Sequence, residues 1–167
     1  MNNKQKPILL IIAGRSGSGK TTLLEGLIPE LKNKGLKIGT IKHHHAEFDI
    51  DIPGKDSWRH KKAGAEKTIV SSPNRIGIVM DADHDHRPEE LAPFLSGVDI
   101  ILVEGYKGEN LPKVEIFRKG VHEGPLCIKD KNLIALVTDS DLDLDVPRVE
   151  LDDMKGLAEL ILKHFSG

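Results

Sequence analysis

The chain has 167 residues, of which 38% are hydrophobic and 30% are charged, so we expect residues 1–167 to form one ordinary globular domain. Its 24 Lys and Arg residues nearly cancel its 26 Asp and Glu residues, which argues against the positive field that holds a nucleic-acid backbone. No apolar run is long enough to span a bilayer, so we expect neither nucleic acid nor a membrane as a partner.

The first predicted element is a strand at residues 7–13, where a continuous apolar run is typical of a strand covered on both faces. A glycine-rich turn follows. Apolar residues then recur at helical spacing from Leu23 to Leu31, and Gly35 ends this predicted helix. A second strand at residues 36–41 completes a strand–helix–strand unit.

Downstream, the same patterns predict strands that alternate with helices. The further strands are expected at residues 68–71, 76–80, 99–103, 114–117 and 133–137, and the helices at residues 56–65, 88–95 and 153–165. This alternation predicts an α/β fold with three layers, in which helices flank a mostly parallel sheet. We expect the strand within residues 112–118 to be an antiparallel addition at the sheet edge.

The turn at residues 14–21 matches the P-loop pattern G-x-x-x-x-G-K-[ST]. It lies between an apolar strand and an amphipathic helix, which distinguishes it from a coincidental glycine-rich turn. The three-layer α/β fold is therefore expected to be a P-loop NTPase fold. Backbone N–H groups there converge on phosphate oxygens, and the lysine adds a mobile positive charge. The residues expected to bind the nucleotide are Gly14, Ser16, Gly17, Ser18, Gly19, Lys20, Thr21 and Thr22.

We expect a magnesium ion to bind together with the nucleotide. Thr21 is the predicted P-loop ligand of Mg²⁺. Glu104 follows the apolar strand at residues 99–103, where a carboxylate can hold the ion or its water. The alternative is a strand-end acid that simply turns into solvent. Lys20 and Glu104 are catalytic candidates on this interpretation.

Five segments in their order and spacing resemble one known family, the molybdopterin-guanine dinucleotide biosynthesis protein B (MobB) family. They are the P-loop, residues 40–44 (TIKHH), 51–59 (DIPGKDSWR), 63–65 (AGA) and 103–107 (VEGYK). The resemblance spans nearly the whole chain. It implies a dimeric GTP-binding protein that assists a guanylyltransferase in attaching GMP to molybdopterin. Together with the expected Mg²⁺ site, this predicts an accessory protein whose GTP hydrolysis is slow and depends on Mg²⁺. GTP, molybdopterin, the molybdenum cofactor guanylyltransferase and a second copy of the chain are thus the expected partners.

The segment at residues 51–59 has the composition of a loop that returns to the phosphates. Asp51 is a candidate second carboxylate for Mg²⁺ and a catalytic candidate, together with Arg59. Lys55 and Asp56 are candidate nucleotide-binding residues. The alternative is an ordinary loop in which Asp56 or Ser57 caps the next helix. Both interpretations are compatible.

Guanine selection needs an acceptor pair that faces N1–H and the exocyclic amine of the base. Asp139 follows the predicted late strand and is the candidate for this role. Residues 139–141 also fit a plain acidic turn, and the sequence has no N-K-x-D signature.

Arg15 directly follows the first P-loop glycine. One hypothesis is that it reaches the phosphates of a partner subunit, as an arginine finger does. The alternative is a solvated arginine at a variable position.

Two groups of histidines suggest a metal at first sight, His43 to His45 and the pair His84 and His86. Three consecutive histidines on a strand end point to opposite faces, so they cannot all meet one ion. His84 and His86 lie among aspartates in an expected loop, and we interpret the histidines as incidental polar residues near a phosphate or pterin site. We therefore expect no histidine metal site. Cys127, the single cysteine, excludes an intrachain disulfide and is interpreted as a small buried residue.

Two other functions remain open, a small-molecule kinase and a metallochaperone GTPase. A kinase needs a lid rich in arginine, and residues 72–88, the best lid candidate, contain only Arg75 and Arg87. The histidines favour the metallochaperone. The single cysteine and the absence of a signal-peptide pattern lead us to expect a cytoplasmic protein.

Overall fold

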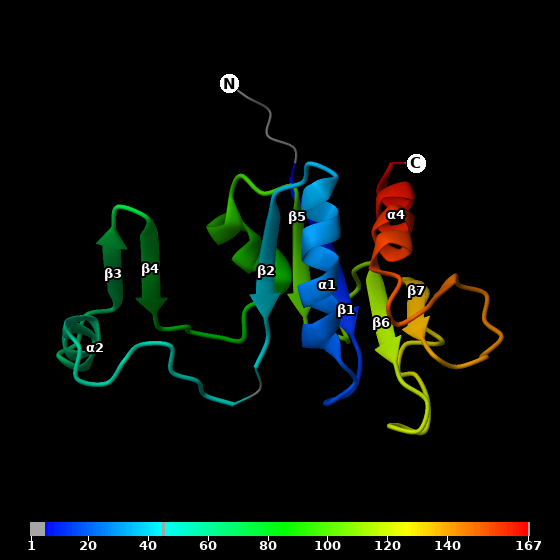
Figure 1. The fold of residues 1–167 in the computed structure, drawn as a ribbon. Helices are drawn as coiled ribbons and strands as arrows, with labels where there is room; N and C mark the ends of the chain where they lie inside the picture. Colours follow the sequence, from blue (N-terminus) through cyan, green and yellow to red (C-terminus); the bar gives the residue numbers. More distant parts are fainter. Residues whose placement is uncertain (1–5, 45, 167) are drawn as a thin grey trace. The chain divides into compact units, whose positions relative to one another are not determined.

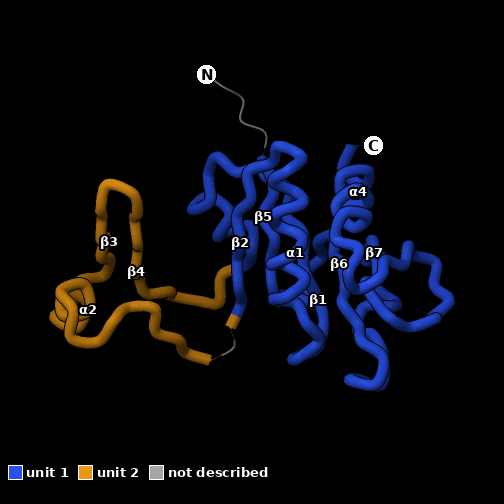
Figure 2. The backbone as a smooth tube through the Cα atoms, in the orientation of Figure 1, with its two compact units in different colours: residues 1–43, 87–167 blue, residues 44–86 orange. Residues whose placement is uncertain are grey.

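The computed structural model of the chain describes residues 6–44 and 46–166. It divides the chain into two compact units (Figure 2). The first unit is built from residues 1–43 and 87–167, and the second from residues 44–86. The second unit therefore lies in the chain between two parts of the first.

The first unit contains a six-stranded sheet in the order β2–β5–β1–β6–β7–β8 (Figure 1). Every pairing of neighbours in this sheet is parallel. The strands are β1 (Ile8–Ala13), β2 (Ile38–Lys42), β5 (Ile100–Glu104), β6 (Lys113–Phe117), β7 (Leu133–Thr138) and β8 (Arg148–Val149). The parallel sheet expected from the continuous apolar runs is confirmed.

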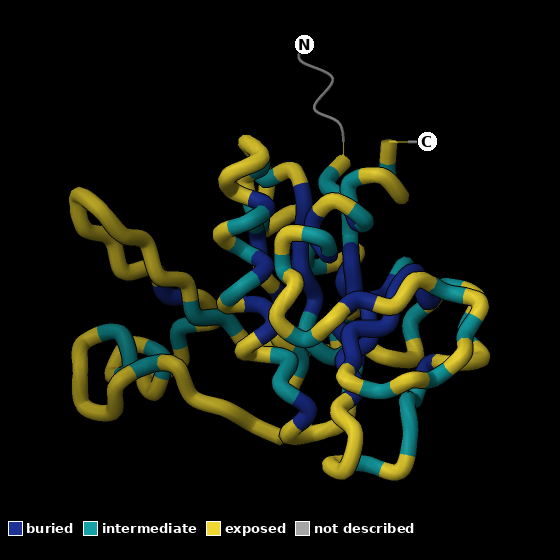
Figure 3. The backbone as a smooth tube through the Cα atoms, turned by 45° about the vertical axis from the view of Figure 1, so that its right-hand side comes forward, coloured by how far each residue is buried: buried dark blue, intermediate teal, exposed yellow. Residues whose placement is uncertain are grey.

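Helices cover both faces of this sheet. On one face, α1 (Lys20–Asn33) and α4 (Met154–Phe165) pack against Leu10, Ile12 and Leu102 (Figure 1). On the other, α3 (Pro88–Leu91) and the short 3-10 helix η1 (Ala92–Leu95) pack against Ile11, Ile101 and neighbouring residues. Figure 3 shows the buried residues in the middle of this unit, and most of them belong to its strands. The three-layer α/β class is therefore confirmed.

The expected place of β6 is wrong. It lies between β1 and β7 and is parallel to both, so it is not an antiparallel edge strand. All five of its residues are buried. Lys113 and Glu115 alternate with apolar residues, a pattern typical of a half-exposed strand, but both charges are satisfied inside the protein. The two-residue strand β8 has no sequence signal of its own and was not predicted.

The two buried charges of β6 hold two loops against the sheet. Lys113, with 0% of its surface exposed, donates from Nζ to the carbonyl oxygens of Lys107 (3.1 Å) and Glu109 (2.9 Å) and pairs with Asp130. Glu115 accepts hydrogen bonds from the backbone N–H groups of residues 126 (2.5 Å) and 127 (2.8 Å). The connections before and after β6 are thereby fixed, in line with the rule that buried charges are paired or hydrogen-bonded.

The second unit consists of α2 (Asp56–Lys62) and a hairpin of β3 (Lys67–Ser72) and β4 (Arg75–Met80). The two strands were predicted, but they pair only with each other, antiparallel, in a separate two-stranded sheet. Among the described residues of this unit, Thr68 alone is buried. The unit thus encloses almost no core of its own. Across the described residues, the structure contains no helix long and apolar enough to cross a membrane.

A substitution at Asp130 tests the contribution of the buried ion pair to stability. The hydrogen bond from Lys113 holds the pKa of Asp130 below its ordinary value, so the pair stabilises the fold above about pH 4 and this contribution is lost as pH falls through the folded pKa. Asp130→Asn leaves Lys113 buried without a counter-charge, and we expect a loss of about 3 kcal/mol in the free energy of unfolding at pH 7.

Urea unfolding at pH 7 and pH 3 measures both effects. The matched control is Asp141→Asn, because the Asp141 side chain is 93% exposed in its pair with Arg148 and such pairs contribute less than about 1 kcal/mol. Equal stability of the two variants at pH 7 would contradict the assignment.

Candidate functional site

The P-loop occupies the connection between β1 and α1, and its backbone requires glycine. Gly14, Gly17 and Gly19 have φ angles of 147°, 76° and 101°, which residues with a Cβ rarely adopt. A Cβ on Gly14 would also lie 2.6 Å from Ser18 Oγ and 2.8 Å from the Ile116 carbonyl oxygen. The loop is therefore packed directly against β6.

Lys20 folds back over this loop. Its Nζ donates to the carbonyl oxygens of Gly14 (3.0 Å) and Arg15 (2.9 Å). Lys20 is also the first residue of α1, and among the described residues no side chain caps this helix. The first N–H groups of the helix and the lysine charge therefore lie together, which is the arrangement that favours an anion.

The side chain of Ser18 also indicates which kind of ligand fits the loop. The residue is 1% exposed, and its Oγ makes no hydrogen bond to any residue that the structure describes. A buried hydroxyl without a partner costs free energy, and a phosphate oxygen would accept its hydrogen bond. The hydroxyl, the glycine backbone and Lys20 together fit a nucleotide phosphate.

Glu104 ends β5, the strand beside β1. Its backbone is in register with Ile12 on one side and Lys42 on the other. Because β1 and β5 are parallel, their carboxyl ends lie side by side, and Glu104 is therefore on the same side of the sheet as the P-loop. The side chain is 14% exposed and pairs with Lys42 Nζ at 3.7 Å. This position suits a carboxylate that holds Mg²⁺ or its water; Lys42 had no predicted role.

Two of the sequence segments that carry the family resemblance meet beside Glu104. The rings of His43 and Tyr106 stack with centroids 4.1 Å apart. Gly105 has φ 101°, and a Cβ there would lie 3.0 Å from the Cβ of His43. The glycine therefore permits the close approach of the two segments. His45 lies outside the described residues.

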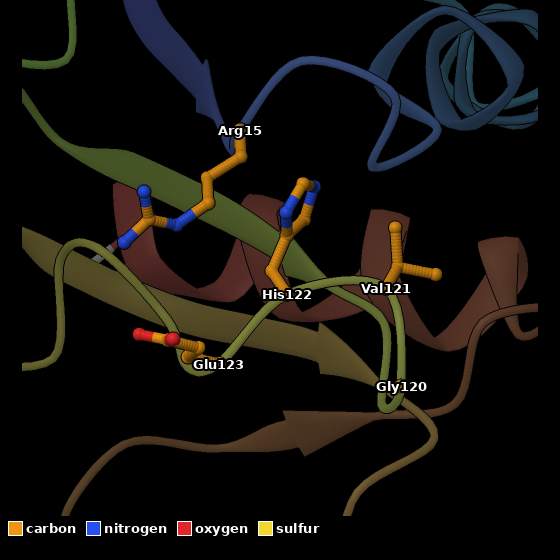
Figure 4. Close-up of a pocket in the computed structure, with 5 residues that line it drawn as sticks. All are labelled: Arg15, Gly120, Val121, His122 and Glu123. Atoms are coloured by element: carbon orange, nitrogen blue, oxygen red, sulfur yellow. The ribbon is translucent and has the colours of Figure 1, made fainter.

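The loop after β6 also contacts the P-loop. His122 Nε2 lies 3.0 Å from the Ser16 carbonyl oxygen, within hydrogen-bond reach. Figure 4 shows Arg15, His122 and Glu123 bordering one space, and a cavity of about 520 Å³ is lined by Arg15 and residues 120–123. Sequence reasoning missed His122, because an isolated histidine in an irregular loop carries no pattern. Arg15 lines this cavity of its own chain, and its proposed action across subunits stays a prediction.

Asp139 follows β7 and is exposed. Its Oδ1 accepts a hydrogen bond from the backbone N–H of Lys119 at 2.7 Å, which ties the loops after β6 and β7 together. The same carboxylate therefore has a structural task, and its role in base selection stays a prediction.

The remaining predicted residues, Asp51, Lys55, Asp56 and Arg59, belong to the second unit. Asp51 Oδ1 accepts from Ser57 Oγ at 2.8 Å, and Asp51 Oδ2 is buried without a hydrogen bond to any described residue. Arg59 and Asp56 form a surface pair at 3.8 Å. Neither Asp56 nor Ser57 caps α2, whose N-cap is Lys55. The contacts described for these residues are with other residues of the second unit, and their role at the nucleotide stays a prediction.

Cys127 is buried, and that burial together with Glu115 raises its pKa to about 11. The thiol is protonated at neutral pH and is a poor nucleophile. This agrees with its interpretation as a small core residue.

Comparisons with known proteins agree with one another. The sequence model of the family described as molybdopterin guanine dinucleotide synthesis protein B matches residues 9–139. A molybdopterin-guanine dinucleotide biosynthesis adapter protein of Escherichia coli K12 is 42% identical, over 93% of this chain and 91% of that protein. A Haemophilus influenzae protein of the same description is 38% identical, over 99% and 94%. The crystal structure of Bacillus subtilis MobB superposes with a TM-score of 0.73 at 30% identity, over 94% and 96%.

Proposed function

The chain belongs to the molybdopterin guanine dinucleotide synthesis protein B family, and from this membership we propose that it is a GTP-binding adapter in molybdopterin guanine dinucleotide synthesis. In this role it assists a molybdenum cofactor guanylyltransferase that attaches GMP to molybdopterin. The observation that carries the proposal is the P-loop of the first unit, where Lys20 Nζ, the start of α1 and the unpartnered Ser18 hydroxyl converge. The relatives of similar length support the adapter role.

The first unit supplies the groups that the bound nucleotide needs. Lys20 neutralises the outer phosphates, and Thr21, the next residue of α1, ligates Mg²⁺. Glu104, which now pairs with Lys42, holds the ion or one of its waters from the neighbouring strand. When bound, Mg²⁺ supplies charge neutralisation at the phosphates.

Base selection and phosphate sensing involve residues outside the P-loop. Asp139 accepts from the guanine N1–H and exocyclic amine with its two carboxylate oxygens, and Oδ1 also keeps its hydrogen bond from the Lys119 N–H. The segment with Asp51, Lys55, Asp56 and Arg59 responds to the terminal phosphate. An adapter acts through its bound state, so hydrolysis is slow and any GTPase activity is weak. The protein works in the cytoplasm, where molybdopterin and the transferase are its partners.

The protein acts as a homodimer, and the hairpin of the second unit supports this part of the proposal. Ile69 faces Ile78 across the hairpin, and Ile76 lies two positions from Ile78 on the same face. These side chains are 64%, 49% and 68% exposed. A two-stranded sheet is marginally stable alone, and a second copy related by two-fold symmetry presents the same apolar face.

Thermal unfolding tests the ligand. With GTP and Mg²⁺ at about 100 times the dissociation constant, we expect the unfolding temperature to rise by roughly 5 to 10 °C, since only the folded state binds. GDP should give a smaller rise, and ATP the smallest. Glu104→Gln should lose most of the increment that Mg²⁺ adds to GTP, whereas the control Glu150→Gln, at an exposed residue of the same unit, should keep it. A preference for ATP would overturn the proposal and favour a kinase.

Light scattering after gel filtration tests the dimer. We expect the protein to elute as a dimer and Ile76→Glu to weaken dimerisation at least tenfold, because a carboxylate in the apolar face must be desolvated. The control is Phe94→Glu, at a 59% exposed residue of η1 in the first unit, which should leave the dimer intact. A monomeric wild-type protein, or an unchanged Ile76→Glu dimer, would refute this arrangement.

A further inference from the structure

The segment that follows β4 gathers three metal-binding side chains. Asp83, His84 and His86 each offer one donor atom, and these atoms lie within 4.8 Å of one another. Three donor side chains therefore meet within four residues of one exposed segment of the second unit. No metal site was expected here, because His84 and His86 were interpreted as incidental polar residues.

The contacts within the cluster resemble those that a cation would replace. His84 Nδ1 lies 2.6 Å from Asp83 Oδ1, and His84 Nε2 lies 2.7 Å from His86 Nδ1. Both separations are hydrogen bonds, so in each of them a proton lies between two atoms that could otherwise bind a metal. Two ligand atoms at about 2.0–2.1 Å from one ion, at 90 to 109°, lie roughly 2.9 to 3.4 Å apart. One ion takes only one nitrogen of His84, so binding breaks one of these two hydrogen bonds. The three ligand atoms, which lie within 4.8 Å of one another, must then approach by up to about 2 Å.

The charge and exposure of the cluster favour a cation. The cluster contains one carboxylate, whose oxygen is a suitable ligand atom for a cation. The third separation, between His86 Nε2 and Asp83 Oδ1, is 3.8 Å. The side chains of Asp83 and His84 are 85% and 50% exposed, and that of His86 is 22% exposed. An ion can therefore reach the donors directly from solvent.

We propose that Asp83, His84 and His86 bind one divalent transition-metal ion. Two imidazoles and one carboxylate are the donor set of Zn²⁺, Ni²⁺ and Cu²⁺ rather than of Mg²⁺, which prefers oxygen ligands. Three protein ligands leave at least one coordination position for water or a partner's ligand. The site is separate in sequence from the P-loop and is independent of the proposed GTP binding.

Titration calorimetry with Zn²⁺ and with Ni²⁺ alone, on the full chain without an affinity tag, tests this site. We expect one ion per chain, with binding weakened at least tenfold by Asp83→Asn and abolished in His84→Ala/His86→Ala. The matched control is His60→Ala, which removes an exposed histidine of α2 in the same unit and should bind metal as the wild type does.

A spectroscopic readout separates ligation from general effects on stability. With Cu²⁺, the electron paramagnetic resonance spectrum should show hyperfine coupling to two imidazole nitrogens, and this coupling should vanish in the double variant. GTP binding should be unchanged in that variant, so a failure of this site and a failure of the P-loop proposal are distinguishable. Substoichiometric binding by the wild type, or wild-type binding by the double variant, would overturn the proposal.

Discussion

The close approach of the P-loop to β6 is the constraint on which the site depends. β6 continues past the end of β1, since Ala13 pairs with Glu115 and the strand runs on to Phe117. The Ile116 carbonyl therefore backs the loop so closely that a side chain at Gly14 would collide with it. A rigid strand behind the loop fixes the direction of its N–H groups before any ligand arrives, and such preorganisation lowers the cost of binding an anion.

The buried charges of β6 extend this support to the surrounding loops. Lys113 and Glu115 fix the connections on either side of the strand through backbone carbonyl and N–H groups. From the second of these loops, His122 reaches the Ser16 carbonyl and the Lys119 N–H reaches Asp139. The strand β6 thus supports the P-loop directly and also positions the loop beside it. Replacing these charges by apolar residues would keep a packed strand but would remove the bonds that orient the loops.

The sequence predicted what depends on local patterns. Continuous apolar runs and helical spacing located the strands and helices of the first unit, and the P-loop was recognisable because its glycines, lysine and flanking elements are neighbours in the chain. The position of β6 was predicted wrongly, because alternating charges suggest exposure unless their distant partner, such as Asp130, is known. His122 and the Asp83–His86 cluster were missed for the same reason, since loop conformation brings their atoms together. The isolated hairpin of the second unit was likewise hidden, because strand patterns do not say which strands pair.

We infer that the loop between β1 and α1 wraps its amides around the terminal phosphates of a nucleotide, with Lys20 balancing the charge. Titration calorimetry of Mg²⁺–GTP into Lys20→Ala tests it most directly, with Lys32→Ala, a lysine in the last turn of the same helix, as the control. We predict at least a tenfold loss of affinity for Lys20→Ala, because its Nζ lies on the loop, and wild-type affinity for Lys32→Ala, at the other end of the helix. Unchanged affinity in Lys20→Ala would contradict it.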